Sequence, residues 1–222
     1  NTPLTFDYLS DEDDFFDGSS ARNGENRRIY SGEGNDEILV NSEDRAFGED
    51  GNDSLNGALG NSHNLLNGGN GDDLLTGGSL DQLVGGNGDD LLKVTGSGNL
   101  LYGDSGVDEF NIVDGSLPDA VKVQYPEYFD EVTVPDITIP ELVDTRNTIM
   151  DFELGVDKIS ITGVEDIASS FEDLELLPAF GDLGSTSIIT SFIDNGTEKE
   201  ISLANVSGVI FNELSSDDFV FG

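Results

Sequence analysis

Glycines and aspartates recur at close spacing in the middle of the chain, and these residue types together are suited to binding a hard cation. The stretch from Gly68 to Gly78 reads GGNGDDLLTGG. Carboxylate and backbone carbonyl oxygens are the ligands that calcium prefers, at about six to eight per ion. Glycine lets the backbone take the dihedral angles that aim consecutive carbonyls at one point. The stretch therefore predicts an oxygen-lined cation site and is unfavourable for a helix or an ordinary strand.

This stretch contains one copy of a nine-residue repeat. Five copies have glycine at the fourth position, aspartate at the sixth and a large apolar residue at the eighth; they begin at Ser31, Gly48, Gly68, Gly85 and Gly103. Their sixth-position aspartates are Asp36, Asp53, Asp73, Asp90 and Asp108, at intervals of 17, 20, 17 and 18 residues. Self-similarity at a fixed period is typical of proteins built from stacked structural repeats.

Weaker copies lie between the five strong ones, with sixth positions at Arg27, Asp44, Asn64, Asp81 and Asn99. Each weak sixth position precedes the next strong one by nine residues, whereas the step from a strong to the next weak position varies from 8 to 11. Every insertion and deletion therefore falls within the weak turns. Because a turn that is clamped by a shared ion cannot change length, we expect the strong turns to form a metal-binding edge. We call it the strong edge, and we call the other edge, where few or no ions are expected, the weak edge.

The repeat resembles the nonapeptide G-G-x-G-x-D-x-U-x of the RTX (repeats-in-toxin) family, whose hemolysin-type repeats bind calcium. The resemblance implies an all-β fold, a calcium-loaded parallel β-roll with two short strands and two turns per lap. It also implies an ion between vertically adjacent turns. The lower turn gives its aspartate and the carbonyls of positions two and four, and the upper turn gives its aspartate and the carbonyls of positions one and three.

Carried onto this sequence, the RTX pattern implies four sites on the strong edge, with interior aspartates shared between neighbouring ions. The four ligand sets are Gly32, Gly34, Asp36, Gly48, Asp50 and Asp53; Glu49, Gly51, Asp53, Gly68, Asn70 and Asp73; Gly69, Gly71, Asp73, Gly85, Asn87 and Asp90; and Gly86, Gly88, Asp90, Gly103, Ser105 and Asp108.

Further sites are expected at the two ends of the repeat. Asp14 and Phe16 stand in the sixth and eighth roles of a turn that lacks glycine. The stretch NTIMDFELGVDKISITG, from Asn147 to Gly163, resembles the segment after the repeats in many RTX proteins, including the serralysin proteases. That resemblance implies a capping calcium at Asp151 and Asp157, although ordinary turn chemistry before a strand is the alternative. The expected total is about four to six Ca²⁺ ions, mainly on one edge.

The repeat pattern also predicts the core and the domain organisation. The eighth positions that would point inward are Ile38, Leu55, Leu75, Leu92 and Phe110, facing Ile29, Ala46, Leu66, Leu83 and Leu101. Residues 1–114 form the predicted roll, 115–144 an acidic, proline-containing insertion, and 145–222 a mostly antiparallel β cap. The cap is expected to contain a short helix starting at Ser170 and a hairpin around Asn195 and Gly196. It ends in LSSDDFVFG, which resembles type I secretion tails.

Composition limits the possible partners and chemistry. The chain has 46 acidic and 9 basic residues, a formal net charge of −37, so binding to nucleic acid or anionic membranes is disfavoured. There is no cysteine and one histidine, His63, which excludes thiolate and multi-histidine metal sites. No apolar run is long enough to span a membrane. The protease and hydrolase motifs H-E-x-x-H and G-x-S-x-G are absent, so we do not expect an enzyme.

These features predict a non-catalytic, calcium-binding RTX module of a secreted or surface-attached bacterial protein. We expect it to stay unfolded in the cytosol, to pass through type I secretion machinery, and to fold on calcium outside the cell. One alternative is the accessory C-terminal region of a larger secreted enzyme, a protease or a lipase. Another is a calcium-dependent adhesion module that binds cell-surface glycans.

Overall fold

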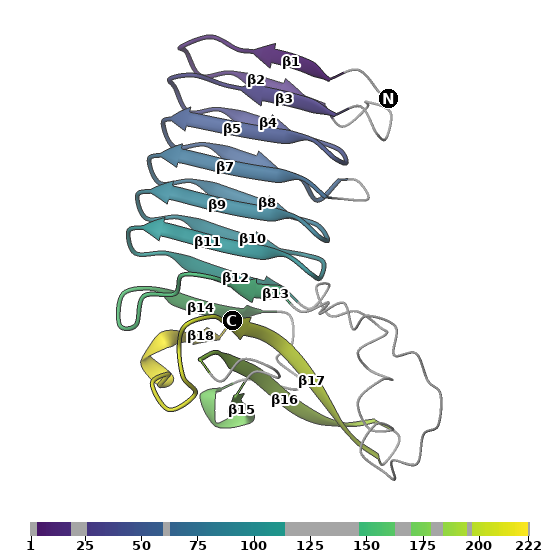
Figure 1. Ribbon diagram of the computed structural model, residues 1–222, viewed down its shortest axis with the longest axis vertical. Helices are drawn as coiled ribbons and strands as arrows, with labels where there is room; N and C mark the ends of the chain where they lie inside the picture. Colours follow the sequence, from purple (N-terminus) through teal and green to yellow (C-terminus); the bar gives the residue numbers. More distant parts are fainter. Residues whose placement is uncertain are drawn as a thin grey trace.

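The chain winds as a flattened coil of short β-strands in the computed structural model, which describes residues 4–18, 26–59, 63–113, 147–162, 170–178, 184–194 and 197–221. Within these residues every regular element is a strand, apart from two single-turn 3-10 helices, η2 (Phe171–Asp173) and η3 (Ser216–Asp218). Figure 1 shows the strands stacked in two layers, with the N-terminus at one end of the stack and β15 to β18 at the other.

Two sheets form the layers. Sheet A has the order β1 (Thr5–Tyr8), β3 (Arg27–Tyr30), β5 (Arg45–Asp50), β7 (Leu65–Asn70), β9 (Gln82–Asn87), β11 (Leu100–Ser105), β13 (Asn147–Ile149), β17 (Thr197–Val206), β16 (Thr186–Asp194) and β15 (Leu174–Pro178). Sheet B has the order β18 (Phe219–Phe221), β14 (Lys158–Thr162), β12 (Glu109–Val113), β10 (Leu91–Val94), β8 (Leu74–Gly77), β6 (Ser54–Asn56), β4 (Glu37–Leu39) and β2 (Phe15–Asp17). Successive strands alternate between the sheets through β14, and neighbouring strands of the coil pair in parallel. The predicted fold class, an all-β parallel β-roll, is confirmed.

The core between the sheets is built around the eighth-position side chains, with Val40, Val94 and Ile112 beside them. All ten predicted core residues are 0% exposed. Strand register aligns them one above another: Leu55 pairs with Leu75 in sheet B, and Leu66 pairs with Leu83 in sheet A. Seventh-position side chains point outward, and those of Leu74 and Leu100 are 38% and 41% exposed. The insertion 115–144 lies outside the described residues.

Parallel pairing continues beyond residue 114. β13 pairs with β11, β14 with β12, and β18 with β14, all in parallel. The reason is visible in the sequence, because Gly155, Asp157 and Ile159 keep the fourth, sixth and eighth residue types of the repeat. Antiparallel pairing is found in β15, β16 and β17.

Two local predictions for the C-terminal part agree with the structure. β16 and β17 form the expected antiparallel hairpin, although Asn195 and Gly196 themselves lie outside the described residues. The expected short helix is the single 3-10 turn η2, whose start is closed by a capping box between Ser170 and Asp173. Because β17 pairs with β13, this hairpin lies next to the last strand of the coil in sheet A and covers its edge.

Candidate metal centre

The sixth-position aspartates of the strong edge form a continuous ladder. The backbone N–H of each aspartate donates to Oδ1 of the aspartate one lap later, at 2.7 to 3.1 Å, from Asp14 to Asp157. The ladder consists of Asp14, Asp36, Asp53, Asp73, Asp90, Asp108 and Asp157. From Asp36 onward each of these side chains is only 2–3% exposed. The structure therefore brings the predicted carboxylates into one buried column.

The second carboxylate oxygens of this column are left without partners. Oδ2 of Asp36, Asp53, Asp73 and Asp90 is buried and has no hydrogen-bond partner among the described residues. Burying an ionised oxygen without a partner costs several kcal/mol, roughly, unless a proton or a cation compensates it. Four such oxygens in consecutive turns point to a cation as the missing partner.

Glycine at the first repeat position leaves space beside Oδ2 of Asp53, Asp73 and Asp90. A Cβ on Gly68 would lie 2.1 Å from Asp73 Oδ2 and 2.7 Å from the carbonyl oxygen of Gly85. A Cβ on Gly48 would lie 2.2 Å from Asp53 Oδ2 and 2.5 Å from the carbonyl oxygen of Gly68. A carboxylate of one turn and a first-position carbonyl of the next turn therefore face the same small space. The RTX pattern assigns the two oxygens of each such pair to the same ion.

The fourth-position glycines hold another row of carbonyls. Gly51, Gly71, Gly88 and Gly106 have φ values between 124° and 152°, which side chains rarely permit. A Cβ on Gly71 would lie 2.1 Å from the carbonyl oxygen of Gly51 in the turn below. Each fourth-position carbonyl therefore points toward the next turn, on the side where the repeat places its ion.

The third-position carbonyls are part of the hydrogen-bond network of the turns. The carbonyl oxygens of Asn70, Asn87 and Ser105 each accept the N–H of the fourth-position glycine one lap earlier, at 2.8 Å. A carbonyl oxygen has two lone pairs, so one remains for an ion. These predicted ligands therefore lie in the strong turns, each with one lone pair outside the hydrogen-bond network.

Burial changes the protonation of the column. Burial raises the pKa of Asp73 and Asp90 to about 7, and that of Asp53 and Asp108 to about 6. The ladder N–H groups act in the opposite direction, and neighbouring carboxylates add to the rise. Without a cation, Asp73 and Asp90 therefore retain protons up to about neutral pH and Asp53 and Asp108 up to about pH 6, whereas a bound cation would favour their ionised form.

The weak edge has the same ladder but satisfies its second atoms from within the protein. Its Oδ1 bonds join Asp44, Asn64, Asp81, Asn99 and Asn147 at 2.7 to 3.1 Å. Asn64 Nδ2 donates to the Gly57 carbonyl at 3.1 Å, and Asn99 Nδ2 donates to the Gly78 carbonyl at 2.9 Å. Asp81 Oδ2 accepts the N–H of Gly78 at 2.7 Å. The second atoms of this column thus have partners within the protein, although burial still raises the pKa of Asp81 to about 6.

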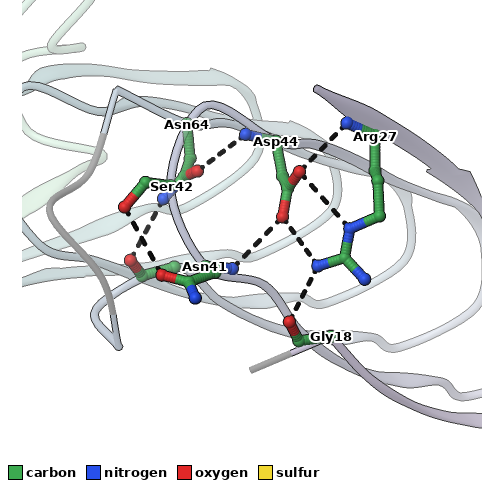
Figure 2. Close-up of polar contacts among 7 residues, drawn as sticks. Gly18, Arg27, Asn41, Ser42, Asp44 and Asn64 are labelled. Carbon is green, nitrogen blue, oxygen red and sulfur yellow. Dashed lines mark hydrogen bonds and ion pairs between the residues drawn. The ribbon is translucent and has the colours of Figure 1, made fainter. Parts of the chain in front are cut away.

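In the first weak copy of the repeat, Arg27 stands at the sixth position and supplies a positive charge (Figure 2). The guanidinium of Arg27 donates to Asp44 Oδ2 at 2.9 Å and to the Gly18 carbonyl at 2.8 Å. The two side chains are 11% and 1% exposed, so this is a largely buried ion pair. Arg27 thus acts on Asp44 as a cation that belongs to the chain itself.

Both ends of the strong column are closed by hydrogen bonds from the protein. Asp14 Oδ2 accepts the N–H and the hydroxyl of Ser10, both at 2.7 Å, and these bonds lower its pKa. Asp157 Oδ2 accepts the N–H of Glu153 at 2.7 Å. Asp151 accepts the N–H groups of Gly103 and Asp104 at 2.9 and 2.8 Å. The terminal ions at Asp14, Asp151 and Asp157 therefore remain predictions, with fewer free oxygens than the interior sites.

One ladder was missed at the sequence level. The fifth-position side chains of Asp13, Asn35, Asn52, Asp72 and Asp89 each accept, through Oδ1, the N–H of the fifth residue one lap later, at 2.8 to 3.0 Å. The signal was present as an Asn or Asp directly before the sixth-position aspartate. It was overlooked because the repeat treats this position as variable. The ladder ties neighbouring strong turns together on their solvent side.

The fold and this column define a parallel β-roll with an acidic, glycine-lined rim. No protein-family model and no curated protein matches the chain. Across the described ranges, no group of three or more His, Cys, Asp or Glu side chains converges as a metal cage. The expected sites differ from such a cage, since each combines two carboxylates with backbone carbonyls. In that same part of the chain, no helix has the length and apolar character needed to cross a membrane.

Proposed function

We propose that this chain is a calcium-binding, non-catalytic module that folds when ions bind along its strong edge. The observation that carries the proposal is the contrast between its two ladders. On the strong edge four buried carboxylate oxygens have no partner among the described residues. On the weak edge, Oδ2 of the aspartates accepts hydrogen bonds from an arginine or a backbone N–H, and the asparagine amides donate to backbone carbonyls. A cation on the strong edge would supply the partner that the protein supplies on the weak edge.

Calcium suits the strong edge better than other metals. The available ligands are carboxylate and carbonyl oxygens, which hard cations prefer, and the chain has no cysteine and one histidine. Calcium accepts six to eight oxygens in variable geometry, whereas Mg²⁺ needs near-octahedral geometry at short distances. Bound calcium would supply positive charge between adjacent turns. Asp53, Asp73 and Asp90 would each serve two neighbouring sites.

Folding should depend on these ions. Each lap of the coil contributes few apolar side chains to the core, and ordering so many glycines costs conformational entropy. The formal charge of −37 adds repulsion between stacked turns. Metal-binding free energy would then be a large part of the folding free energy. The resemblance to RTX repeats and to type I secretion tails supports a bacterial protein that folds only after export, where calcium is abundant.

A calcium titration followed by circular dichroism tests this proposal. In excess chelator we expect a largely unfolded spectrum, and we expect the β-sheet spectrum to appear at calcium concentrations of roughly 0.1 to 1 mM, as for extracellular calcium modules. Calorimetry on the same protein should count about four ions. Magnesium at equal concentration is the control and should restore little structure. A chain that gives the same β-sheet spectrum in chelator and in calcium would contradict the proposal.

A further inference from the structure

Part of the outer face of sheet A carries no acidic side chain. Strand register from β1 to β11 aligns its outward side chains in two rows. The first row is Phe6, Arg28, Arg45, Leu65, Gln82 and Leu100, and the second is Tyr8, Tyr30, Phe47, Asn67, Val84 and Tyr102. Neither row contains a carboxylate, and we call these two rows the acid-free face. The exposed acids of the same strands, Glu49, Asp50 and Asp104, lie beyond the two rows, toward the strong edge. The outward rows of sheet B do contain acids, at Asp17, Glu37 and Glu109.

Two arginines lie side by side on this acid-free face. Arg28 and Arg45 are paired in register on β3 and β5. Within the described residues the one salt bridge is Arg27–Asp44, so neither Arg28 nor Arg45 has a carboxylate partner there. Nε of Arg28 is buried and has no hydrogen-bond partner in the same part of the chain, and its guanidinium lies 5.8 Å from the centre of the Phe6 ring. Unpaired arginines in so acidic a chain point to an anionic partner.

A groove of about 450 Å³ runs beside Arg45, between the acid-free face and the weak edge. Its lining includes Arg45, His63, Leu65, Leu80, Gln82 and Leu100. Asp81 also lines it, but both of its oxygens accept backbone N–H groups. The volume lies within the range of small-molecule sites, about 300 to 1,000 Å³. The groove thus combines positive charge, an amide and apolar surface.

The aromatic residues of the second row limit how a ligand can bind. Tyr8 and Tyr30 stack with ring centres 5.2 Å apart, and Tyr30 and Phe47 stack at 4.8 Å, with interplanar angles of 11° and 7°. Ring faces that cover one another leave mainly ring edges and hydroxyl groups for a partner. The aromatic row therefore forms a strip that offers ring edges to a ligand, whose specific contacts would be made by the neighbouring polar side chains.

The dimensions of the strip favour an extended polymer. Six strands at about 4.8 Å spacing give a length of roughly 24 Å, and two rows of side chains lie roughly 7 Å apart. That area is far below the approximately 800 Å² per partner of a stable protein interface, which disfavours a second copy. An extended peptide would instead prefer a strand edge, where backbone groups are available.

We propose that the acid-free face binds a linear polysaccharide bearing carboxylate groups. Arg28 and Arg45 would each bind a carboxylate, since a guanidinium matches its planar geometry. Gln82 and Asn67 would bind hydroxyl groups, and Leu65 and Leu100 would contact sugar C–H surfaces. The net charge of −37 opposes such a ligand at long range. At physiological ionic strength, salt screens charges that lie more than about 8 Å away, so the nearby arginines determine the local attraction for a carboxylate. This proposal depends on the proposed function in one respect, because the face exists only when the roll is folded.

Calorimetry with the calcium-loaded protein tests this site, with a linear oligogalacturonate as the probe and an uncharged maltooligosaccharide of equal length beside it. We expect binding of the acidic probe alone, weakened at least tenfold by Arg45→Gln. The matched control is Lys93→Gln, which removes one outward positive charge from sheet B and should leave binding unchanged. Leu65→Glu, which puts a carboxylate beside Arg45, should also abolish binding. Circular dichroism of each variant establishes that it is folded.

Several results would overturn the proposal. Calcium could bridge the acidic sugar to the strong edge, and binding would then survive Arg45→Gln. Equal binding of the neutral oligosaccharide, tighter binding of an acidic peptide, or no binding at all would also contradict it. So would a dimer, detected by light scattering, that Arg45→Gln dissociates. If the chain folds without calcium, the proposed calcium function fails, but the same titration on the folded metal-free protein still tests the face.

Discussion

The difference between the two edges is a difference of single atoms at the sixth repeat position. Aspartate and asparagine both provide the Oδ1 that accepts the ladder N–H, so either residue can build the column. The second side-chain atom, Oδ2 of aspartate or Nδ2 of asparagine, determines whether the side chain must accept or donate a further hydrogen bond. Oδ2 of Asp73 is buried without a partner, whereas Nδ2 of Asn64 donates to a carbonyl. An amide thus completes its turn by donating to a carbonyl, whereas a carboxylate needs a donor or a cation. At Asp81 the Gly78 N–H is that donor, and at Asp73 the described residues provide none.

Exchanging these atoms gives a test at the scale of one residue. Asp73→Asn keeps the Oδ1 that bonds the Asp53 N–H but removes a carboxylate that two ions would share. We expect calorimetry to count up to two fewer ions and the calcium midpoint of folding to rise several-fold. Asp81→Asn is the matched change on the weak edge and should leave the ion count unaltered, although it costs stability at the Gly78 N–H. Equal loss of ions in both variants would show that the edges do not differ.

At the scale of elements, the two kinds of turn differ in how much length they tolerate. Strong turns stack with carbonyls and glycine Cα atoms in close approach, as at Gly51 and Gly71. An extra residue there would displace every ligand of two sites. Weak turns already vary by three residues along the chain, from 8 to 11 in the step that contains them. Their ladder is preserved across a 20-residue interval, as in the bond from Asp44 to Asn64.

A one-glycine insertion tests this difference. Placed after Leu59 in a weak turn, it should change the calcium midpoint and the thermal stability little, since lengthening a flexible loop costs only a few tenths of a kcal/mol, roughly. Placed after Asn70 in a strong turn, it should prevent cooperative folding in calcium. Circular dichroism in saturating calcium measures both. Comparable damage at the two places would mean that the strong turns are not clamped.

The elements of the roll could be predicted because one periodicity sets both the core and the column. The eighth-position residues, such as Leu55 and Leu75, are buried where the repeat places them. The charge partner of Asp44 was not predicted, because Arg27 stands where the repeat expects an acid and looks like a degenerate copy. The acid-free face was also missed, since it becomes visible only when strand register aligns residues about 17 to 20 positions apart.

At the scale of the whole molecule, the buried column should link stability to pH. In the ion-free folded chain, burial raises the pKa of Asp73 and Asp90 to about 7. In the unfolded chain these carboxyls return to about 3.9. Between these values the folded state binds protons that the unfolded state does not. The stabilising contribution is therefore complete below about pH 4 and is lost as pH rises through about 7. Calcium reverses this dependence, because it binds the ionised carboxylates and competes with protons.

Two series of circular dichroism spectra, each from pH 5 to 8, test this linkage. In metal-free buffer we expect more ordered structure at pH 5 than at pH 7.5. In saturating calcium we expect the reverse, with the calcium midpoint rising as pH falls through 7 to 6 and protons released on binding. Asp73→Asn should flatten the metal-free series, since it removes one titrating group. Light scattering must exclude aggregation near the pI of about 4.1. If both series have the same slope, protons and calcium do not compete for the column, and the ions bind elsewhere.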